Sequence, residues 1–415
     1  MTPNEDGEQA RAMAAAVARR SYGKLIAALC SRTRHVAAAE DALSDAFATA
    51  LAQWPSGGCP ANPEGWLLTV ARRKLIDGSR RRQVAESAAE QLKVLDEGLA
   101  DIGSDGEIPD RRLALMFACA HPAIDESVRA PLILQTVLGF DAATIASAFL
   151  SSPAAMGKRL GRAKEKIRQA GIPLRVPDPA ELRDRLDAVL DAIYAVFSEG
   201  WADPGATEFA KRELSGEALY LGRLVSELLP EEPEALGLLA LMLHAEARRL
   251  ARRRDGEYVP LREQDARLWD AGMIDEAEVL LLRASTLGSI GRFQLEGALQ
   301  SAHVYRRRTE CADWSVVVRL YDALLEISAS PVVAINRALA VAERDGVKAG
   351  LAALESVAAD NRLIQYQPYW AARADLLSSS GAQVEAMHAY DIAIGLERDP
   401  AVRRFLQQRR GALGG

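Results

Sequence analysis

Cysteine is scarce in this chain, with four residues in 415, at positions 30, 59, 119 and 311. No Cys-x-x-Cys pair occurs, and no combination of cysteine with histidine has the spacing of a four-ligand zinc site. We interpret the cysteines as buried or incidental thiols, with redox sensing by Cys59 as the alternative. A Gly-rich phosphate loop is also missing, and no histidine is grouped with a Ser or Cys nucleophile. We therefore predict no enzyme, no cofactor and no metal.

Long hydrophobic runs are missing as well. No apolar stretch approaches the ~20 residues that span a bilayer, and the acidic N-terminus lacks the features of a signal peptide. We therefore expect a cytoplasmic protein. No strand pattern is apparent, which favours an all-α fold. The length suggests two to four domains, and 49% hydrophobic and 26% charged residues is an ordinary globular balance.

Net positive charge, usual in a DNA-binding protein, is absent overall: the formal net charge is −6. It is unevenly spread. Residues 1–175 hold 23 Lys and Arg against 20 Asp and Glu, whereas residues 176–415 hold 28 against 37. The positive charge is concentrated on two predicted helices. The acidic C-terminal part should not bind nucleic acid.

Residues 139–168 predict two short helices joined by a tight turn. Asp141 is a good N-cap for the first helix, and Ser151 or Ser152, followed by Pro153, for the second. The inner face of the second helix is apolar, and its outer face is basic: Lys158, Arg159, Arg162, Lys164, Lys166 and Arg168. A helix-turn-helix of this kind places side chains in a DNA major groove. The alternative is an ordinary helical hairpin with a solvated basic face.

Two further predicted helices precede this segment. Residues 37–54 combine an apolar face with an acidic outer face, formed by Glu40, Asp41 and Asp45. Residues 66–82 follow a turn at 62–65, and their outward cations are Arg72, Arg73, Lys74, Arg80, Arg81 and Arg82. Because DNA phosphates would repel the acidic face, that face is better suited to a basic protein partner.

These pieces occur in the order and spacing of bacterial extracytoplasmic-function sigma factors. The resemblance rests on residues 39–47, 65–67, 71–77 and the helix-turn-helix together. The chain resembles the group that carries a long helical C-terminal domain with tetratricopeptide-like repeats. Further matching pieces are residues 108–113, 119–123, 170–173, 197–201, 265–270 and 330–333, so the resemblance extends over nearly the whole chain.

The resemblance implies three functional sites. The acidic helix would bind the clamp helices of the largest RNA polymerase subunit through Glu40, Asp41 and Asp45. The loop 57–65 and the basic helix would recognise and open the promoter −10 element through Asn62, Trp66, Arg72, Arg73, Lys74, Arg80, Arg81 and Arg82. The helix-turn-helix would recognise the −35 element, and also touch the polymerase flap, through Lys158, Arg159, Arg162 and Lys164.

The sequence departs from the family pattern in two places. Ser44 stands where a glutamine is usual, and residues 154–157 at the start of the recognition helix are poor in hydrogen-bonding side chains. Base readout would then depend on Lys158, Arg159 and Arg162, with a contribution from DNA shape.

The predicted domain order follows the resemblance and the breaks in the sequence. Sigma region 2 covers 8–82, a polar, Gly-rich flexible linker covers 83–108, and sigma region 4 covers 109–171. A Pro-rich linker at 172–180 precedes a separately folding helical domain at 181–415.

The C-terminal domain is predicted to consist of helical pairs. The spacing of a tetratricopeptide repeat is clearest at Trp370, Ala374, Gly381, Ala386, Tyr390 and Ala393. The concave groove of such an array would accept a protein or peptide partner. The run Arg248, Arg249, Arg252, Arg253 and Arg254 is interpreted as a solvated helix end. Asp265, Arg267, Trp269 and Asp270 are assigned a structural role in ion pairing and stacking.

We therefore predict a sigma factor whose partners are core RNA polymerase and promoter DNA, with no membrane association. Its C-terminal domain would act as a scaffold with a regulatory role rather than as an inhibitor alone. The alternative is a one-component helix-turn-helix regulator or adaptor that binds an operator without polymerase. The acidic helix favours the sigma factor, because an operator-binding protein does not need it.

Overall fold

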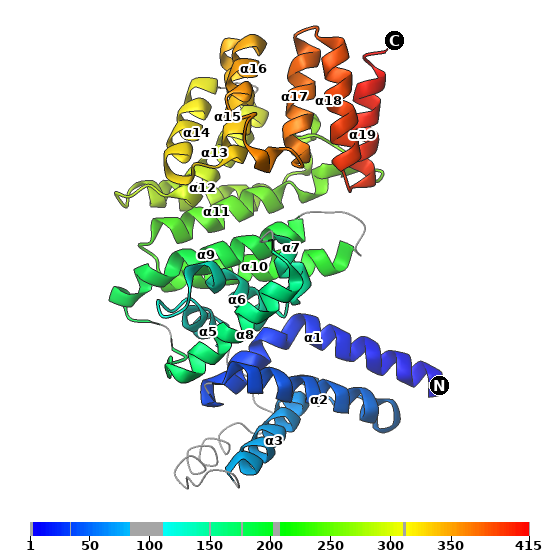
Figure 1. Cartoon of the computed structure of the whole chain (residues 1–415), viewed down its shortest axis with the longest axis vertical. Coiled ribbons are helices and arrows are strands. Elements are labelled where there is room, and N and C mark those ends of the chain that lie inside the picture. The colour runs from blue at the N-terminus through cyan, green and yellow to red at the C-terminus, as the bar shows by residue number, and fades with distance from the viewer. Residues whose placement is uncertain are drawn as a thin grey trace. The chain divides into compact units, whose positions relative to one another are not determined.

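The computed structural model describes residues 3–33, 35–83, 111–148, 151–175, 177–201, 208–309 and 313–414. The chain divides into two compact units, Met1–Ala195 and Val196–Gly415 (Figure 1). Helices make up nearly all the regular structure of the described residues, and the predicted all-α class is confirmed.

The first unit contains two groups of helices and the start of α9. The N-terminal group is α1 (Pro3–Thr33), α2 (Val36–Gly57) and α3 (Pro63–Gln83). The second group is α5 (Arg112–Cys119), α6 (Glu126–Leu138), α7 (Ala142–Ala148) and α8 (Pro153–Gln169). The predicted linker at 83–108 lies outside the described residues, apart from Gln83 at the end of α3.

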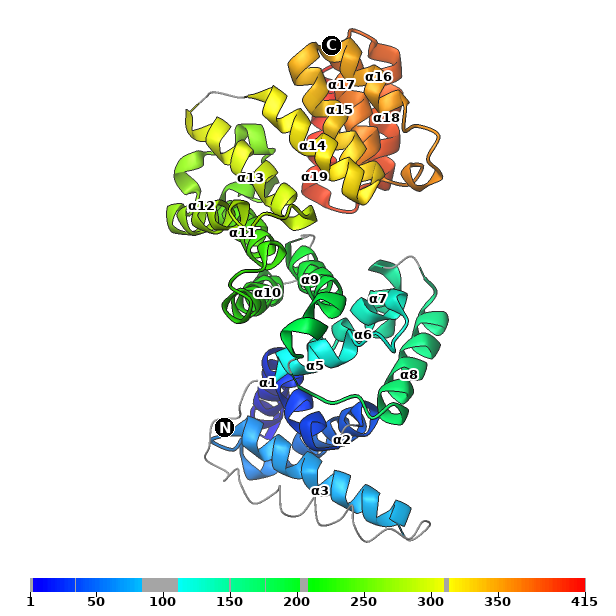
Figure 2. The same cartoon turned by 90° about the vertical axis from the view of Figure 1, so that its left-hand side faces the viewer.

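The two groups of the first unit pack against each other. Helix α1 lies against α2 and α3 and also against α5 and α6, while α8 reaches α2 (Figure 2). The side chains that fill this unit are fully buried aliphatics and aromatics: Leu25, Ile26, Leu29, Leu43, Leu67, Phe117, Leu132 and Ile133. Burial of such side chains supplies about 1.5–3 kcal/mol each toward folding.

The helix-turn-helix forms as its caps predict. The Asp141 carboxylate accepts a hydrogen bond from the Thr144 N–H at 2.7 Å. Of the two candidate caps for α8, it is Ser152 whose hydroxyl accepts from the Ala155 N–H, at 3.3 Å. The predicted apolar face of α8 is buried: Met156, Leu160, Ala163 and Ile167. The recognition helix is therefore fixed by its inner face, and its outer face remains available.

Helix α9 (Pro179–Trp201) begins after the Pro-rich segment and contains the boundary between the two units. In its first half, the Arg185 side chain is 5% exposed and donates to the Phe117 carbonyl of α5. The domain limits predicted from the sequence stay predictions.

The second unit continues as a series of helices. They are α10 (Glu208–Leu228), α11 (Pro233–Ala247), α12 (Ala271–Ser285), α13 (Arg292–Thr309), α14 (Trp314–Ser328), α15 (Pro331–Asp345), α16 (Val347–Glu355), α17 (Gln367–Ser379), α18 (Gln383–Leu396) and α19 (Pro400–Gly411). Successive helices pack together along the series, and α11 contacts both α12 and α13. The small residues predicted to bring α17 and α18 together, Ala374, Ala386 and Ala393, are all fully buried.

The expectation that strands are absent is wrong at four residues. A hairpin pairs β1 (Arg253–Arg254) with β2 (Glu257–Tyr258), with Arg253 opposite Tyr258. The turn residues Asp255 and Gly256 have φ of 54° and 81°. Positive φ at both central positions is the type I′ turn that Asp-Gly favours, so the sequence did carry a hairpin signal.

Close contact between helices in the second unit depends on glycine. The Glu234 carboxylate of α11 accepts from the backbone N–H groups of Phe293 and Gln294, at 2.9 and 3.0 Å, and so caps α13. One turn further along α11 lies Gly237. A Cβ atom there would stand 2.5 Å from the Gln294 nitrogen, so a side chain does not fit between the two backbones.

Substitution of Gly237 tests this contact. Gly237→Ala should destabilise the protein by about 1–3 kcal/mol through overpacking, although alanine is the better helix former. The matched control is Gly216→Ala in α10, where a Cβ atom would meet nothing within 4 Å. Urea unfolding followed by circular dichroism should show a lower midpoint for Gly237→Ala only. Equal midpoints for the two variants would show that α11 and α13 are not this close.

Candidate functional site

The predicted acidic face lies on α2, and two of its three carboxylates are accessible. Asp41 and Asp45 are exposed. The Asp45 carboxylate lies 3.9 Å from the Lys74 ammonium of α3, and both side chains remain about half exposed or more, at 64% and 47%. A surface pair of this kind contributes little to stability. Both aspartates therefore remain free to meet a cationic partner.

Glu40, the third predicted acidic residue, is directed into the unit instead. Its Oε2 accepts from the Lys164 Nζ of α8 at 2.5 Å, and the two side chains are only 16% and 11% exposed. The other oxygen, Oε1, is buried without a hydrogen-bond partner among the described residues. Burial raises the pKa of the Glu40 carboxyl, although the Lys164 charge opposes this effect. A residue predicted to contact polymerase and one predicted to contact DNA therefore bind each other.

The predicted −10 residues lie on or just before α3. Asn62 is exposed and caps the helix, since its Oδ1 accepts from the Gly65 N–H at 2.9 Å. Trp66 packs edge-on against Trp54 of α2, with ring centroids 5.5 Å apart. Asn62 and Trp66 therefore have structural roles whether or not they contact DNA.

The cations of α3 differ in their exposure. Arg73 and Lys74 are exposed and Arg72 is half-buried. The side chains of Arg80, Arg81 and Arg82, at the end of α3, lie outside what the structure describes. In the described part of α3, the accessible positive charge is therefore that of Arg73 and Lys74.

The predicted −35 residues lie on α8. Lys158 and Arg162 are exposed, whereas Arg159 is half-buried. The Arg159 Nη2 donates to the Ser127 hydroxyl at 2.6 Å and to the Ser127 carbonyl at 3.2 Å, at the start of α6. Arg159 and Arg162 line a pocket of about 280 Å³ between the two helices. Lys158 and Arg162 are thus the accessible predicted cations, and Arg159 is held in place by α6.

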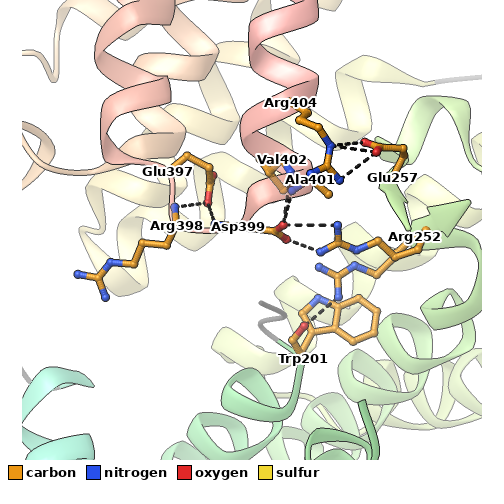
Figure 3. Close-up of polar contacts among 10 residues, drawn as sticks. Trp201, Arg252, Glu257, Glu397, Arg398, Asp399, Ala401, Val402 and Arg404 are labelled. Atoms are coloured by element: carbon orange, nitrogen blue, oxygen red, sulfur yellow. Dashed lines mark hydrogen bonds and ion pairs between the residues drawn. The ribbon is translucent and has the colours of Figure 1, made fainter. Parts of the chain in front are cut away.

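The arginine run of the second unit was misread as a solvated helix end. Arg248 is 8% exposed. The Trp201 ring has the Arg249 and Arg252 guanidinium carbons 5.1 and 4.0 Å from its centroid. Arg252 also donates to the Trp201 carbonyl at 2.8 Å (Figure 3). Cations over an aromatic ring are stabilised by its negative face, so this run joins α9, α11 and the hairpin.

The hairpin is also bound to the C-terminal helix. Arg253 pairs with Asp399, which caps α19 through the Ala401 and Val402 N–H groups (Figure 3). Burial opposes ionisation of Asp399, but these donors hold its pKa below the usual value. Arg404 of α19 pairs with Glu257 at 2.9 Å. No local pattern could have revealed these contacts, since the partners are far apart in the sequence.

The remaining candidate residues show no catalytic arrangement. Asp265 pairs with Arg267 at 2.7 Å, and Trp269 is buried. Cys30 and Cys119 are buried and Cys59 is exposed. No set of His, Cys, Asp and Glu side chains among the described residues could hold a metal ion. None of the described helices has the length and apolar character that a membrane span requires.

The structure up to this point defines an all-α protein with a three-helix module, α1–α3, followed by a helix-turn-helix. Comparison with known proteins adds that residues 17–84 match the model of sigma-70 region 2, which covers α2, α3 and most of α1. Residues 185–285 match a family of unknown function (DUF6596). No solved structure matches.

A relative matches over most of the length. The chain is 38% identical to the uncharacterized protein R00370 of Rhizobium meliloti (strain 1021) over 388 residues, which is 92% of this chain and 91% of the relative. With its region 2 match, the chain belongs to the sigma-70 family. Membership supports a role in transcription initiation, with core RNA polymerase and promoter DNA as partners.

The Trp54–Trp66 contact gives a prediction for the region 2 module. Trp66→Ala should lower the urea midpoint, because an edge-to-face aromatic pair contributes about 0.5–1.5 kcal/mol beyond the area it buries. Trp66→Phe keeps an aromatic ring and should lose less. Thr69→Ala, at an exposed position of the same helix, is the control. A Trp66→Ala variant as stable as wild type would mean that Trp54 does not hold this ring.

Proposed function

We propose that this chain is a sigma factor of the extracytoplasmic-function type that directs promoter-specific transcription initiation in the cytoplasm. One observation carries the proposal: the region 2 match, residues 17–84, coincides with the helices that present an acidic face on α2 beside a basic α3. The helix-turn-helix α7–α8 follows with its own basic face. An operator-binding regulator would need only this second element.

In this proposal, α2 contacts the clamp helices of polymerase through Asp41 and Asp45. Both are exposed, and Asp45 is only loosely paired with Lys74. Complementary charge across a wet interface raises the association rate and gives a strong dependence on salt. The α3 cations Arg73 and Lys74 are exposed toward the −10 DNA, and Lys158 and Arg162 toward the −35 DNA.

Charge reversal tests the polymerase contact. In transcription in vitro with core polymerase alone, on the promoter of the protein's own operon, wild type should give a specific transcript. The double variant Asp41→Lys, Asp45→Lys should lose at least tenfold in core affinity, because two attractive pairs become repulsive.

The matched control is Glu326→Lys, Glu343→Lys, which makes the same charge change at exposed positions of α14 and α15. Undiminished core binding by the α2 variant would reject the role of the acidic face. A failure of wild type to support transcription, combined with operator binding in the absence of polymerase, would favour the one-component regulator.

Arginine substitution tests the −35 contact. If Arg159 reads a guanine, Arg159→Ala should cost about 1–3 kcal/mol in binding and relax specificity at one position. If it contacts phosphate alone, the loss should be uniform across sequences, with a salt slope smaller by about one. Lys348→Ala, an exposed cation of α16, is the control. A normal footprint over the −35 region by Arg159→Ala would remove Arg159 from the interface.

For the second unit we propose a tetratricopeptide-like array that acts as a scaffold with a regulatory role. Its packed helical pairs support this, as does Gly346 at the turn between α15 and α16, with φ of 96°. A largely apolar pocket of about 600 Å³ lies between α12, α13 and α14, with Leu282 and Trp314 in its lining. A protein or peptide partner would bind in such a groove.

A further inference from the structure

Helix α1 of the region 2 module contacts α6 too closely for a side chain. A Cβ atom at Gly23 would lie 1.7 Å from the Val137 carbonyl oxygen of α6. One residue earlier, the Tyr22 ring covers Gly139, the left-handed residue that ends α6, at 3.0 Å from where its Cβ atom would be. The helix-turn-helix module is therefore docked on region 2 by backbone contact, through residues that neither proposed partner needs.

The second contact between the modules is the Glu40–Lys164 pair. Withdrawing two charges from water costs several kcal/mol per ion, and their attraction offsets this only when the geometry and the remaining hydrogen bonds are good. Here Glu40 Oε1 is buried with no such bond to any described residue. The pair therefore specifies one docked arrangement without giving it large stability, which suits a contact that has to break.

Two thiols lie in the same interface. Cys30 of α1 and Cys119 of α5 are both 0% exposed. Both sense the charges of Glu40 and Lys164, and Cys119 Sγ lies 3.3 Å from the Thr136 hydroxyl of α6. Burial raises the pKa of both thiols, that of Cys119 to about 12. They are unreactive while the modules stay docked, because the thiolate is the nucleophile.

We infer that the free protein is a closed state in which the −35 helix α8 is latched onto the polymerase-binding helix α2 through Glu40 and Lys164. This inference rests on the proposed function. In the closed state Lys164 is withheld from DNA and Glu40 from polymerase, so both partners compete with the latch. A ligand that binds only the open form shifts the population toward it. Polymerase binding at α2 thus releases α8 for the promoter.

The test measures how fast iodoacetamide alkylates Cys119 and Cys30, site by site, by mass spectrometry. Cys59, in the exposed loop after α2, is the internal standard. In the free protein Cys119 should react far more slowly than Cys59. The single variants Glu40→Lys and Lys164→Glu should react about tenfold faster at Cys119 or more, because each buries two like charges.

The charge-swapped variant with both substitutions restores an ion pair and should return the Cys119 rate toward that of wild type. Amides of α2 and α3 must stay protected from hydrogen exchange in every variant, which separates opening from unfolding. Single variants with the wild-type rate, or a swapped variant as fast as the singles, would overturn the latch.

Gly23→Ala tests the docking without touching a proposed binding residue. It should accelerate Cys119 alkylation, since the added methyl collides with Val137, whereas Gly216→Ala should not. Protection of Cys119 unchanged by Gly23→Ala would overturn the docked arrangement.

The last arm adds core polymerase to the wild-type protein. Faster Cys119 alkylation in the complex supports release, and an unchanged rate in a complex that forms overturns it. If no complex forms, the proposed function fails, and the closed state is then judged by the variants alone.

Discussion

The fold depends on a few places where helix backbones meet without a side chain between them. Gly23 lies against the Val137 carbonyl, Gly237 against the Gln294 backbone, and Gly350 of α16 against Ala342 of α15, where an added Cβ atom would be 2.4 Å from the Ala342 Cβ. Each glycine weakens its own helix by about 1 kcal/mol relative to alanine. The close packing of neighbouring side chains that such contacts permit offsets this cost. The same constraint thus recurs in both units.

Closeness has a functional meaning only in the first unit. There the glycine contact brings together two modules whose outer faces serve different partners in the proposed function. The Glu40–Lys164 pair joins those faces at 2.5 Å. Charge placed for intermolecular recognition is thus used within the molecule, and affinity for each partner includes the work of separating the pair.

Features set by neighbouring residues were predictable from the sequence. Asp141 and Ser152 cap their helices, and the inward face of α8 is buried as its period requires. Leu51 of α2, assigned to an apolar face by the same reasoning, is 46% exposed. Periodicity identifies a helical face but not where the covering neighbour ends.

Features set by distant residues were not predictable. Glu40 and Lys164 are 124 positions apart, and a charged residue on a helix is ordinarily taken as solvated. The arginine run failed for the same reason, because its partners Trp201 and Asp399 lie far away along the chain. By contrast, the Asp255-Gly256 turn was a local signal that could have identified the hairpin.

The hairpin changes how the helical series of the second unit can come apart. In an open array each repeat contacts only its neighbours, and the terminal helix frays first. Here Arg253 and Glu257, from the segment after α11, hold Asp399 and Arg404 of α19, which closes a loop of 146 residues between Arg253 and Asp399. The last helix is therefore not a loose end, and its fraying is coupled to the melting of helices near the start of the series.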